Sequence, residues 1–175
     1  MGVILTVDDF VVKPYSLAVG PDVVDSFTDM IREDRQHYWI KKLLGEVEGQ
    51  RFIDNIDEAT FKPTDPDLLK LHNGFSFPFL DDVIHFSGIK RNLMRAFFKE
   101  WSDEQPNINL ETGNVTLKTV AAEYDNGIKG IKLWNELVRE NLVLACYMTL
   151  DTVENPNATT FPNYTFQALE NETTI

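Results

Sequence analysis

The feature that most constrains the fold is a long segment near the C-terminal end whose apolar residues recur at helical spacing. The segment begins near Asn126, and its apolar stripe consists of Ile128, Ile131, Trp134, Val138, Leu142 and Ala145. Its second half, residues 142–148, is apolar nearly all round. A helix of this kind is typical of a buried position, because other elements must cover it on most sides. We therefore expect a mainly α-helical domain with this helix in its core.

Two shorter helical regions are predicted in the first third of the chain. Pro21 followed by Asp22 is typical of a helix start, and apolar residues recur from there to Gly45, with the polar run 32–37 between them. Gly45 is expected to end or bend this helix before a further short one that reaches Ile56. The polar run predicts a solvated face or, in an oligomer, a contact with a neighbouring subunit.

Two further helical segments are predicted in the middle of the chain. Asp65 or Asp67 provides the N-cap of a short segment that ends at the pair 73–74. The next helix follows Gly88 and is apolar on more than one side, which indicates a central position. Between the two, the aromatic-rich residues 75–80 are expected to form a loop anchored in the core.

Three extensions are expected around a single core domain of residues 21–153. Residues 1–20 are rich in β-branched side chains and predict an extended N-terminal arm. Residues 107–118 alternate apolar and polar side chains around a Thr-Gly-Asn turn, which predicts a short β-hairpin. A lone hairpin is marginally stable, so it needs a surface to pack on. Residues 154–175 are expected to form an extended C-terminal tail.

The tail has the composition of a segment that does not fold alone. From Asp151 onward it contains acidic residues but no Lys or Arg, and its isolated apolar residues are Phe161, Tyr164, Phe166 and Leu169. Such side chains can dock on another surface. We expect them to dock on a partner, so that deleting residues 156–175 preserves the helical fold and weakens assembly.

The charge balance restricts the partners. The chain has 16 Lys and Arg against 28 Asp and Glu, a net charge of −12. Tight nucleic-acid binding requires clustered cations, so we do not expect this protein to grip DNA. No apolar run is long enough to span a membrane and no signal peptide is recognisable, which predicts a soluble protein made in the cytoplasm. Cys146 lies in an apolar run and is expected in the core.

No pattern typical of catalysis, metal binding or cofactor binding is found. His37, His72 and His85 lack the spacing of metal ligands, and no glycine-rich loop leads into a Lys-Ser or Lys-Thr pair. The acidic pairs 8–9 and 81–82 are expected to cap helices or form turns. We therefore predict no catalytic, cofactor-binding or metal-binding residues, and a protein that is not an enzyme.

Three segments carry a resemblance to a known family. They are Leu5-Thr6-Val7-Asp8-Asp9-Phe10, the helical run that ends in Lys41-Lys42-Leu43-Leu44-Gly45, and residues 86–101 followed later by Lys132-Leu133-Trp134-Asn135-Glu136-Leu137-Val138. Their order and spacing over roughly residues 3–150 resemble the small head-to-tail connector, or ring, proteins of tailed bacteriophages. The likeness is greatest to those of crAss-like and other Bacteroidetes-infecting phages. The tail after Asn155 lies outside it.

The resemblance implies a structural virion protein. Its implied fold is a helical-bundle connector core, and its implied assembly is a homo-oligomeric ring of about twelve subunits. The implied partners are the portal protein and tail or further ring proteins, in the head–tail connector region of a virion assembled in the host cytoplasm. The matching residues would be scaffold, with Leu43, Leu44, Leu93, Phe97 and Trp134 in the core and Gly45 and Gly88 at helix ends.

The acidic charge fits such a connector. DNA must pass through the channel of a connector without being held there. An acidic wall repels phosphate groups, whereas a basic wall would bind them. We therefore expect part of the net charge of −12 to line a lumen.

Two other function classes stay open from the sequence alone. A small acidic binding module or inhibitor of the DNA-mimic type would be a monomer or dimer with its carboxylates gathered on one helix face. An enzyme whose site is assembled only in three dimensions would use Asp81, Asp82 and His85. On a helix, spacings of three and four would place His85 on one face with either aspartate.

Overall fold

The computed structural model of the chain describes residues 2–10, 27–104, 117–151 and 156–170. The protein is mainly α-helical with two small antiparallel sheets. In chain order the elements are the 3-10 helix η1 (Val7–Phe10), α2 (Glu33–Leu44), α3 (Glu46–Asp54), β1 (Ile56–Asp57), β2 (Lys62–Pro63), α4 (Pro66–Asn73), β3 (Phe75–Phe79), β4 (Asp82–Phe86), α5 (Ile89–Glu104), α6 (Leu117–Met148) and α7 (Asn157–Thr160).

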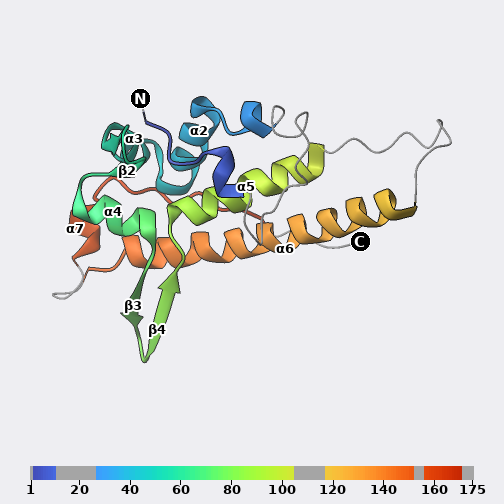
Figure 1. Cartoon of the computed structure of the whole chain (residues 1–175). Helices are drawn as coiled ribbons and strands as arrows, with labels where there is room; N and C mark the ends of the chain where they lie inside the picture. Colours follow the sequence, from blue (N-terminus) through green and yellow to red (C-terminus); the bar gives the residue numbers. More distant parts are fainter. Residues whose placement is uncertain (1, 11–26, 105–116, 152–155, 171–175) are drawn as a thin grey trace.

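The helices stack in layers. Figure 1 shows α5 running along α6, while α2 and α3 lie on the other side of α5. The hairpin of β3 and β4 crosses α6 near its C-terminal end and projects beyond it. No helix in the described ranges has the length and hydrophobicity that a membrane span requires.

The predicted helix ends at Gly45, Asp65 and Gly88 are confirmed. Gly45 lies between α2 and α3 with a φ of 82°, in the left-handed region that favours glycine. The side chain of Asp65 accepts hydrogen bonds from the backbone N–H groups of Asp67 and Leu68, which makes it the N-cap of α4. Gly88 immediately precedes α5. These positions are readable from sequence because capping depends on local chemistry.

The first predicted helix is not continuous. Arg32 has an extended backbone (ψ of 157°), and α2 begins one residue later. Gln36, inside the polar run, is only 1% exposed. Its amide donates to the carbonyls of Ile31 and Leu5, and its Oε1 accepts from the N–H groups of Ile4 and Leu5. The face expected to be solvated therefore holds the N-terminal segment at this point.

The N-terminal arm is only partly extended. Residues 11–20 of the predicted arm lie outside the described residues. Residues 7–10 form η1, and Ile4, Leu5 and Phe10 are buried in the core. Phe10 packs against Phe27 with ring centroids 4.5 Å apart. The described part of the arm is thus an integral part of the domain.

The β structure lies elsewhere than predicted. The loop expected at residues 75–80 is wrong, because residues 75–79 form β3 and pair with β4. Phe75, Phe77 and Phe79 face the same side, which is the period-two pattern of a strand. The proline at position 78 had argued against a strand in the sequence. Most of the hairpin predicted at 107–118 lies outside the described residues, and α6 already begins at Leu117, well before Asn126.

The predicted core residues are buried or nearly so. Leu43, Leu44, Leu93 and Phe97 are fully buried, while Trp134 packs on the core from its edge. Trp134 on α6 and Trp39 on α2 meet edge-to-face with centroids 5.9 Å apart. Aromatic pairs of this geometry add to the burial of apolar area, so this contact helps to join α2 to α6.

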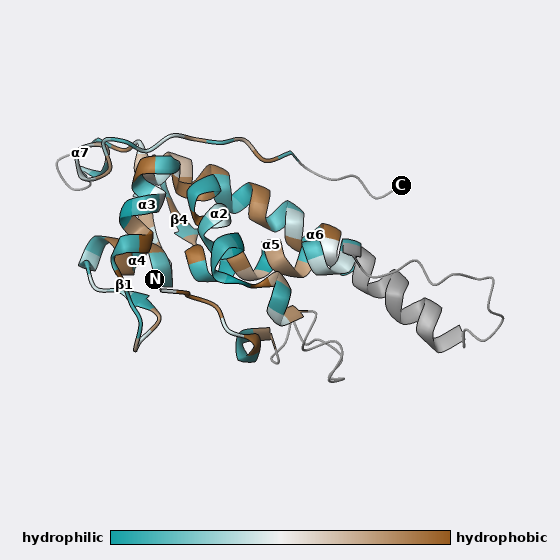
Figure 2. Cartoon of the chain, turned by 90° about the horizontal axis from the view of Figure 1, so that it is seen from above, coloured by the Kyte–Doolittle hydropathy of each residue, from teal (hydrophilic) through white to brown (hydrophobic). Residues whose placement is uncertain are grey.

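The C-terminal tail docks on its own domain, contrary to the expectation that it would need a partner. Phe161 is 3% exposed, and Tyr164 and Leu169 pack against the core, while Phe166 stays exposed. Figure 2 shows the segment crossing the body as an extended chain after α7. Its apolar side chains fill a seam of the domain, so deleting residues 156–175 would remove part of the core.

Candidate interaction surface

The β3–β4 hairpin has one face packed on the helical body. Phe75 and Phe77 alternate on β3, and Phe86 lies opposite Phe75 on β4. Tyr147 of α6 packs on Phe75 and Phe77, with ring centroids 4.2 and 5.1 Å away. This aromatic contact supplies the surface that a two-stranded hairpin needs for stability.

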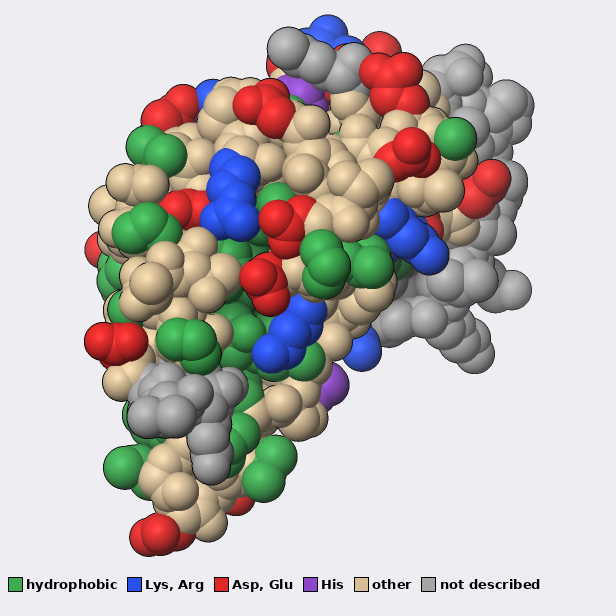
Figure 3. All heavy atoms as spheres, turned by 90° about the vertical axis from the view of Figure 1, so that its left-hand side faces the viewer, with side chains coloured by type: hydrophobic (Ala, Val, Ile, Leu, Met, Phe, Trp, Pro, Cys, Tyr) green, Lys and Arg blue, Asp and Glu red, His purple; other side chains and the backbone are tan. Residues whose placement is uncertain are grey.

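The tip of the hairpin extends beyond this contact. Leu80, in the turn, is 89% exposed with a φ of 55°, and Val83 is 69% exposed. Leucine is uncommon at positive φ, where Asn or Asp is enriched several-fold. Asp81 and Asp82 lie between the two apolar residues. Figure 3 shows the projection at the lower end of the molecule, with carboxylates at its extremity and hydrophobic side chains on its flanks.

At the base of the hairpin two glycine backbones lie very close together. Gly74 ends α4 with a φ of 88°, and Gly88 precedes α5 with a φ of 95°. A Cβ on Gly88 would lie 2.6 Å from the carbonyl oxygen of His72 and 2.7 Å from the nitrogen of Gly74. Only glycine allows this close approach, so a side chain at Gly88 would force the two backbones apart.

The outer face of α6 presents a second exposed surface. Lys132, Arg139 and Leu142 are exposed, and Leu142 has an exposed fraction of 52%. A shallow hollow of about 320 Å³ is lined by Lys132, Asn135, Glu136 and Arg139. Neither Lys132 nor Arg139 has an ion-pair partner in the described part of the chain. In a molecule with a net charge of −12, this is a local cationic surface.

The residues of the enzyme alternative lie on the β3–β4 hairpin and not on a helix. Asp82 lies opposite Phe79, and His85 lies opposite Ser76 in the strand pairing. Residues three apart on a strand point to opposite faces, so the shared helical face expected for His85 and Asp82 is wrong. His85 Nδ1 lies 3.2 Å from the hydroxyl of Ser76, on the exposed face of the hairpin.

The three histidines lie on separate elements. His37 on α2 approaches the carbonyl of Gly2, and His72 at the end of α4 is 3% exposed. Burial lowers the pKa of His72, although a hydrogen bond with Asn73 opposes the shift. Among the described residues, no three His, Cys, Asp or Glu side chains are placed to hold a metal ion.

Two carboxylates at turns, those of Asp9 and Asp57, have structural partners. Asp9 accepts from the N–H of Thr6 and forms an ion pair of 2.8 Å with Lys90. Asp57 accepts from the N–H and hydroxyl of Thr60, and these bonds hold its pKa below the usual value. Cys146, which was expected in the core, is only half-buried on α6, near Tyr164 of the tail. These groups serve turns and docking contacts.

A buried polar cluster joins α5 to α6, and the sequence analysis missed it. Glu140 accepts from the N–H and hydroxyl of Ser87 at 2.7 and 2.9 Å. Arg95, 3% exposed, donates to Asn92 and Ser87 and pairs with Glu136 at 3.2 Å. Arg95 lies among the apolar residues of the α5 stripe. A charged residue in such a stripe was the sequence signal for a buried polar contact. These contacts link α5 to α6, and the pairing of Arg95 offsets the cost of burying its charge.

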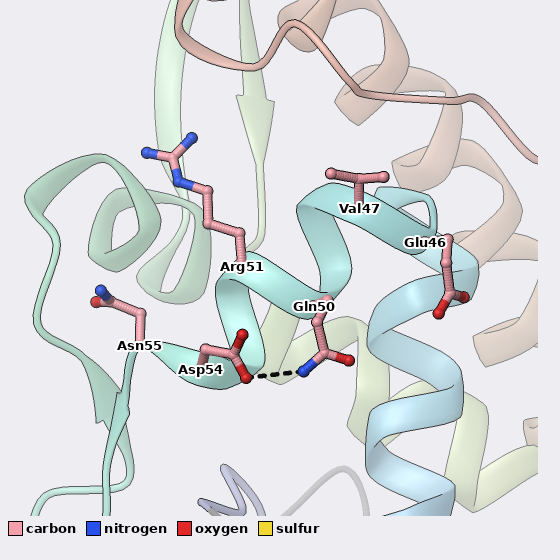
Figure 4. Close-up of a pocket in the computed structure, with 6 residues that line it drawn as sticks. All are labelled: Glu46, Val47, Gln50, Arg51, Asp54 and Asn55. Atoms are coloured by element: carbon pink, nitrogen blue, oxygen red, sulfur yellow. Dashed lines mark hydrogen bonds between the residues drawn. The ribbon is translucent and has the colours of Figure 1, made fainter.

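The hollow beside α3 lacks convergent chemistry. It has a volume of about 620 Å³ and is lined by Glu46, Val47, Gln50, Arg51, Asp54 and Asn55. Figure 4 shows Gln50 bonded to Asp54 along the helix surface, while Arg51 points away from both. Arg51 is engaged elsewhere, with Glu48, Asp65 and the carbonyl of Thr160. The hollow is a depression along one helix face.

The exposed hairpin tip and the outer face of α6 are thus the surfaces with the clearest unmet binding potential. Comparisons with known proteins add no relative: no family model, no curated protein and no solved structure matches the chain. The function is therefore inferred from the surfaces of the chain itself and from the sequence resemblance.

Proposed function

We propose that this protein is a structural subunit of an oligomeric ring that joins the portal of a tailed bacteriophage to its tail and forms part of the DNA channel. The observation that carries the proposal is the β3–β4 hairpin, whose base packs closely at Gly74 and Gly88 and whose tip exposes Leu80 and Val83. Exposing apolar side chains to water is unfavourable in free energy, and a partner that covers them removes this penalty. A ring supplies that partner to every subunit.

The helical body supports the proposal because it provides a stiff frame. α5 and α6 are joined by the apolar core and by the Arg95–Glu140 polar cluster. A ring that transmits position from portal to tail requires subunits that keep one shape. The motifs that resemble phage connectors fall largely on α2, α5 and α6 of this frame.

The charge of the chain also supports the proposal. About twelve copies of a subunit with net charge −12 would give a strongly negative ring, whose lumen repels DNA phosphates. The DNA-mimic alternative requires carboxylates gathered on one face. On the face that Figure 3 presents, Asp and Glu are interleaved with Lys and Arg, so this face is not the uniformly acidic one that a mimic requires.

The test is the oligomeric state with and without the portal protein of the same phage, measured by mass photometry and negative-stain microscopy. We expect closed rings on the portal, and their loss when Leu80→Ser and Val83→Ser are combined. Phe166→Ser is the matched control, because Phe166 is 45% exposed but lies on the tail. A wild-type chain that remains monomeric and does not join the portal would contradict the proposed function.

A further inference from the structure

We propose that the tip of the β3–β4 hairpin of one copy docks on the outer face of α6 of the next copy. The inference rests on the proposed ring and names the two surfaces through which neighbouring subunits meet. The donor surface is the tip, residues 80–83, and the receptor surface is formed by Lys132, Asn135, Arg139 and Leu142 of α6.

The donor surface combines two kinds of chemistry. Leu80 and Val83 offer apolar side chains that are 89% and 69% exposed. Asp81 and Asp82 offer two carboxylates, and neither has an ion-pair partner in the described chain. The only side-chain bond of Asp82 there is the one it accepts from the N–H of Val83. A partner for this tip must therefore present both cations and an apolar side chain.

The receptor surface has that composition. Lys132, Arg139 and Leu142 are spaced by seven and three residues, so they lie along one line of the helix surface. The hollow of about 320 Å³ lies between Lys132 and Arg139. The carboxylate of Glu136 at its edge is compensated by Arg95 at 3.2 Å. The two cations are thus available for the aspartates of the tip.

The contact has to join two copies. Figure 1 shows the hairpin running away from α6, and Tyr147 fixes its inner face against the body. A strand of this length spans roughly 17 Å, so the tip is held away from the α6 surface of its own chain. The tip and the α6 face are different patches, so their contact is heterologous, and repeated contacts of that type close into a ring when the rotation permits.

Charge complementarity also explains why the contact is specific. Chains of net charge −12 repel one another at long range, so random encounters between copies are disfavoured. A local pairing of two aspartates with Lys132 and Arg139 sets the orientation of approach, while Leu80 and Leu142 contribute apolar burial. The acidic remainder of the surface stays free for the lumen.

Charge reversal tests the pairing on full-length chains. We expect Asp81→Lys with Asp82→Lys to weaken ring formation by about tenfold or more, and Lys132→Asp with Arg139→Asp to do the same. Mixing the two doubly substituted chains, or combining all four changes in one chain, should restore assembly. The matched control is Asp29→Lys with Asp151→Lys, which alters two exposed aspartates elsewhere by the same charge.

The outcomes separate this inference from the proposed function. Circular dichroism and urea unfolding first verify that each variant folds. Reversed chains that assemble as well as wild type, or a loss that the combined changes fail to restore, would overturn the hairpin contact while leaving the ring intact. Wild-type chains that form no ring on the portal would overturn both.

A disulfide experiment measures the same contact directly. Asp81→Cys with Asn135→Cys, in a chain that also carries Cys146→Ser, should give a ladder of covalent multimers on mild oxidation, because the paired Cα atoms must lie within about 7 Å. The control pair Asp81→Cys with Arg91→Cys should stay monomeric. A ladder absent from the first pair under ring-forming conditions argues decisively against the contact.

Discussion

The C-terminal segment, residues 156–170, and the β3–β4 hairpin are both attached to the helical body, but they place their apolar residues in opposite ways. The segment buries Phe161 in the core, and its backbone is held by side chains of α6. The hairpin packs only its inner half on α6 and leaves Leu80 and Val83 in solvent.

The difference follows from where each backbone finds its hydrogen bonds. The hairpin satisfies its backbone through the pairing of β3 with β4, so its tip can project. Beyond α7, the described part of the segment has no strand pairing. Asn141 donates to the carbonyl of Gln167 at 2.7 Å, and Trp134 Nε1 donates to that of Glu170 at 2.8 Å. A segment that depends on its receptor in this way belongs to the folded domain, whereas the hairpin tip is available to a partner.

The largest test of this comparison is Phe161→Ala. The side chain is 3% exposed and lies under the guanidinium of Arg51 at 5.6 Å, so its removal leaves a cavity. We expect a loss of about 3–4 kcal/mol in the free energy of unfolding, measured with urea. Phe166→Ala is the control and should change it by less than about 0.5 kcal/mol. Equal effects of the two substitutions would mean that the segment is not part of the core.

The next test concerns the closely packed base of the hairpin. Gly88→Ala forces a Cβ to within 2.6 Å of the His72 carbonyl at a φ of 95°. Since backbone atoms on both sides must move, we expect a loss of about 2–3 kcal/mol. Gly130→Ala is a useful contrast, because the crowding there comes from the side chain of Ser102, which can rotate. A loss of stability at Gly88 no greater than at Gly130 would show that the hairpin hinges at its base.

A third test removes one backbone contact of the C-terminal segment. Asn141→Ala deletes the hydrogen bond to Gln167 and leaves that carbonyl without its donor. We expect a loss of about 1–2 kcal/mol in the free energy of unfolding. Hydrogen exchange should increase selectively in residues 164–170. If protection in the hairpin fell by as much, the two regions would not be independent.

A fourth test uses pH. Burial lowers the pKa of His72 from its ordinary value of 6.5, so the unfolded chain binds a proton more readily than the folded one. Stability at this site should therefore be full at neutral pH and should decrease as the pH falls below about 6.5. His72→Gln should reduce the difference in unfolding free energy between pH 7.5 and pH 5. A profile unchanged by the substitution would remove His72 from the acid response.

The smallest expected effect on stability is that of Leu80→Asn. The side chain is 89% exposed and its φ is 55°, a conformation that Asn adopts more readily. Stability should change by less than about 0.5 kcal/mol, while assembly on the portal decreases. A marked loss of stability in the monomer would mean that the tip is a part of the core.

The sequence predicted those features that depend on neighbouring residues. The Asp65 cap and the helix boundaries at Gly45 and Gly88 are encoded by local chemistry. The second half of α6, expected to be buried on most sides, is buried only in part, because Leu142 of the predicted stripe is 52% exposed. The prediction from sequence failed at Phe75–Phe79, where the proline at 78 concealed a strand whose pairing partner lies in the next segment. The prediction of a solvated face also failed at Gln36, whose buried side chain forms hydrogen bonds with the backbone of Ile4 and Leu5.

The interaction surface was predictable only in part. In the sequence, Asp81 and Asp82 are recognisable as an acidic pair. Leu80 is not distinctive, because the chain has many leucines. Their exposure is a consequence of how far the hairpin projects past Tyr147, which no local pattern contains. The same holds for Lys132 and Arg139, whose place on the outer line of α6 depends on which face α5 covers.

By itself, then, the amino-acid sequence determined that the chain forms a helical body, that helix boundaries lie at Gly45, Asp65 and Gly88, and that the net charge is −12. The tertiary structure alone decided that Phe161, Tyr164 and Leu169 turn inward and that the tip at Leu80 turns outward. The physical reason is that burial depends on contacts between residues far apart in the chain. Two segments of similar apolar content therefore acquire opposite roles only when the rest of the domain is in place.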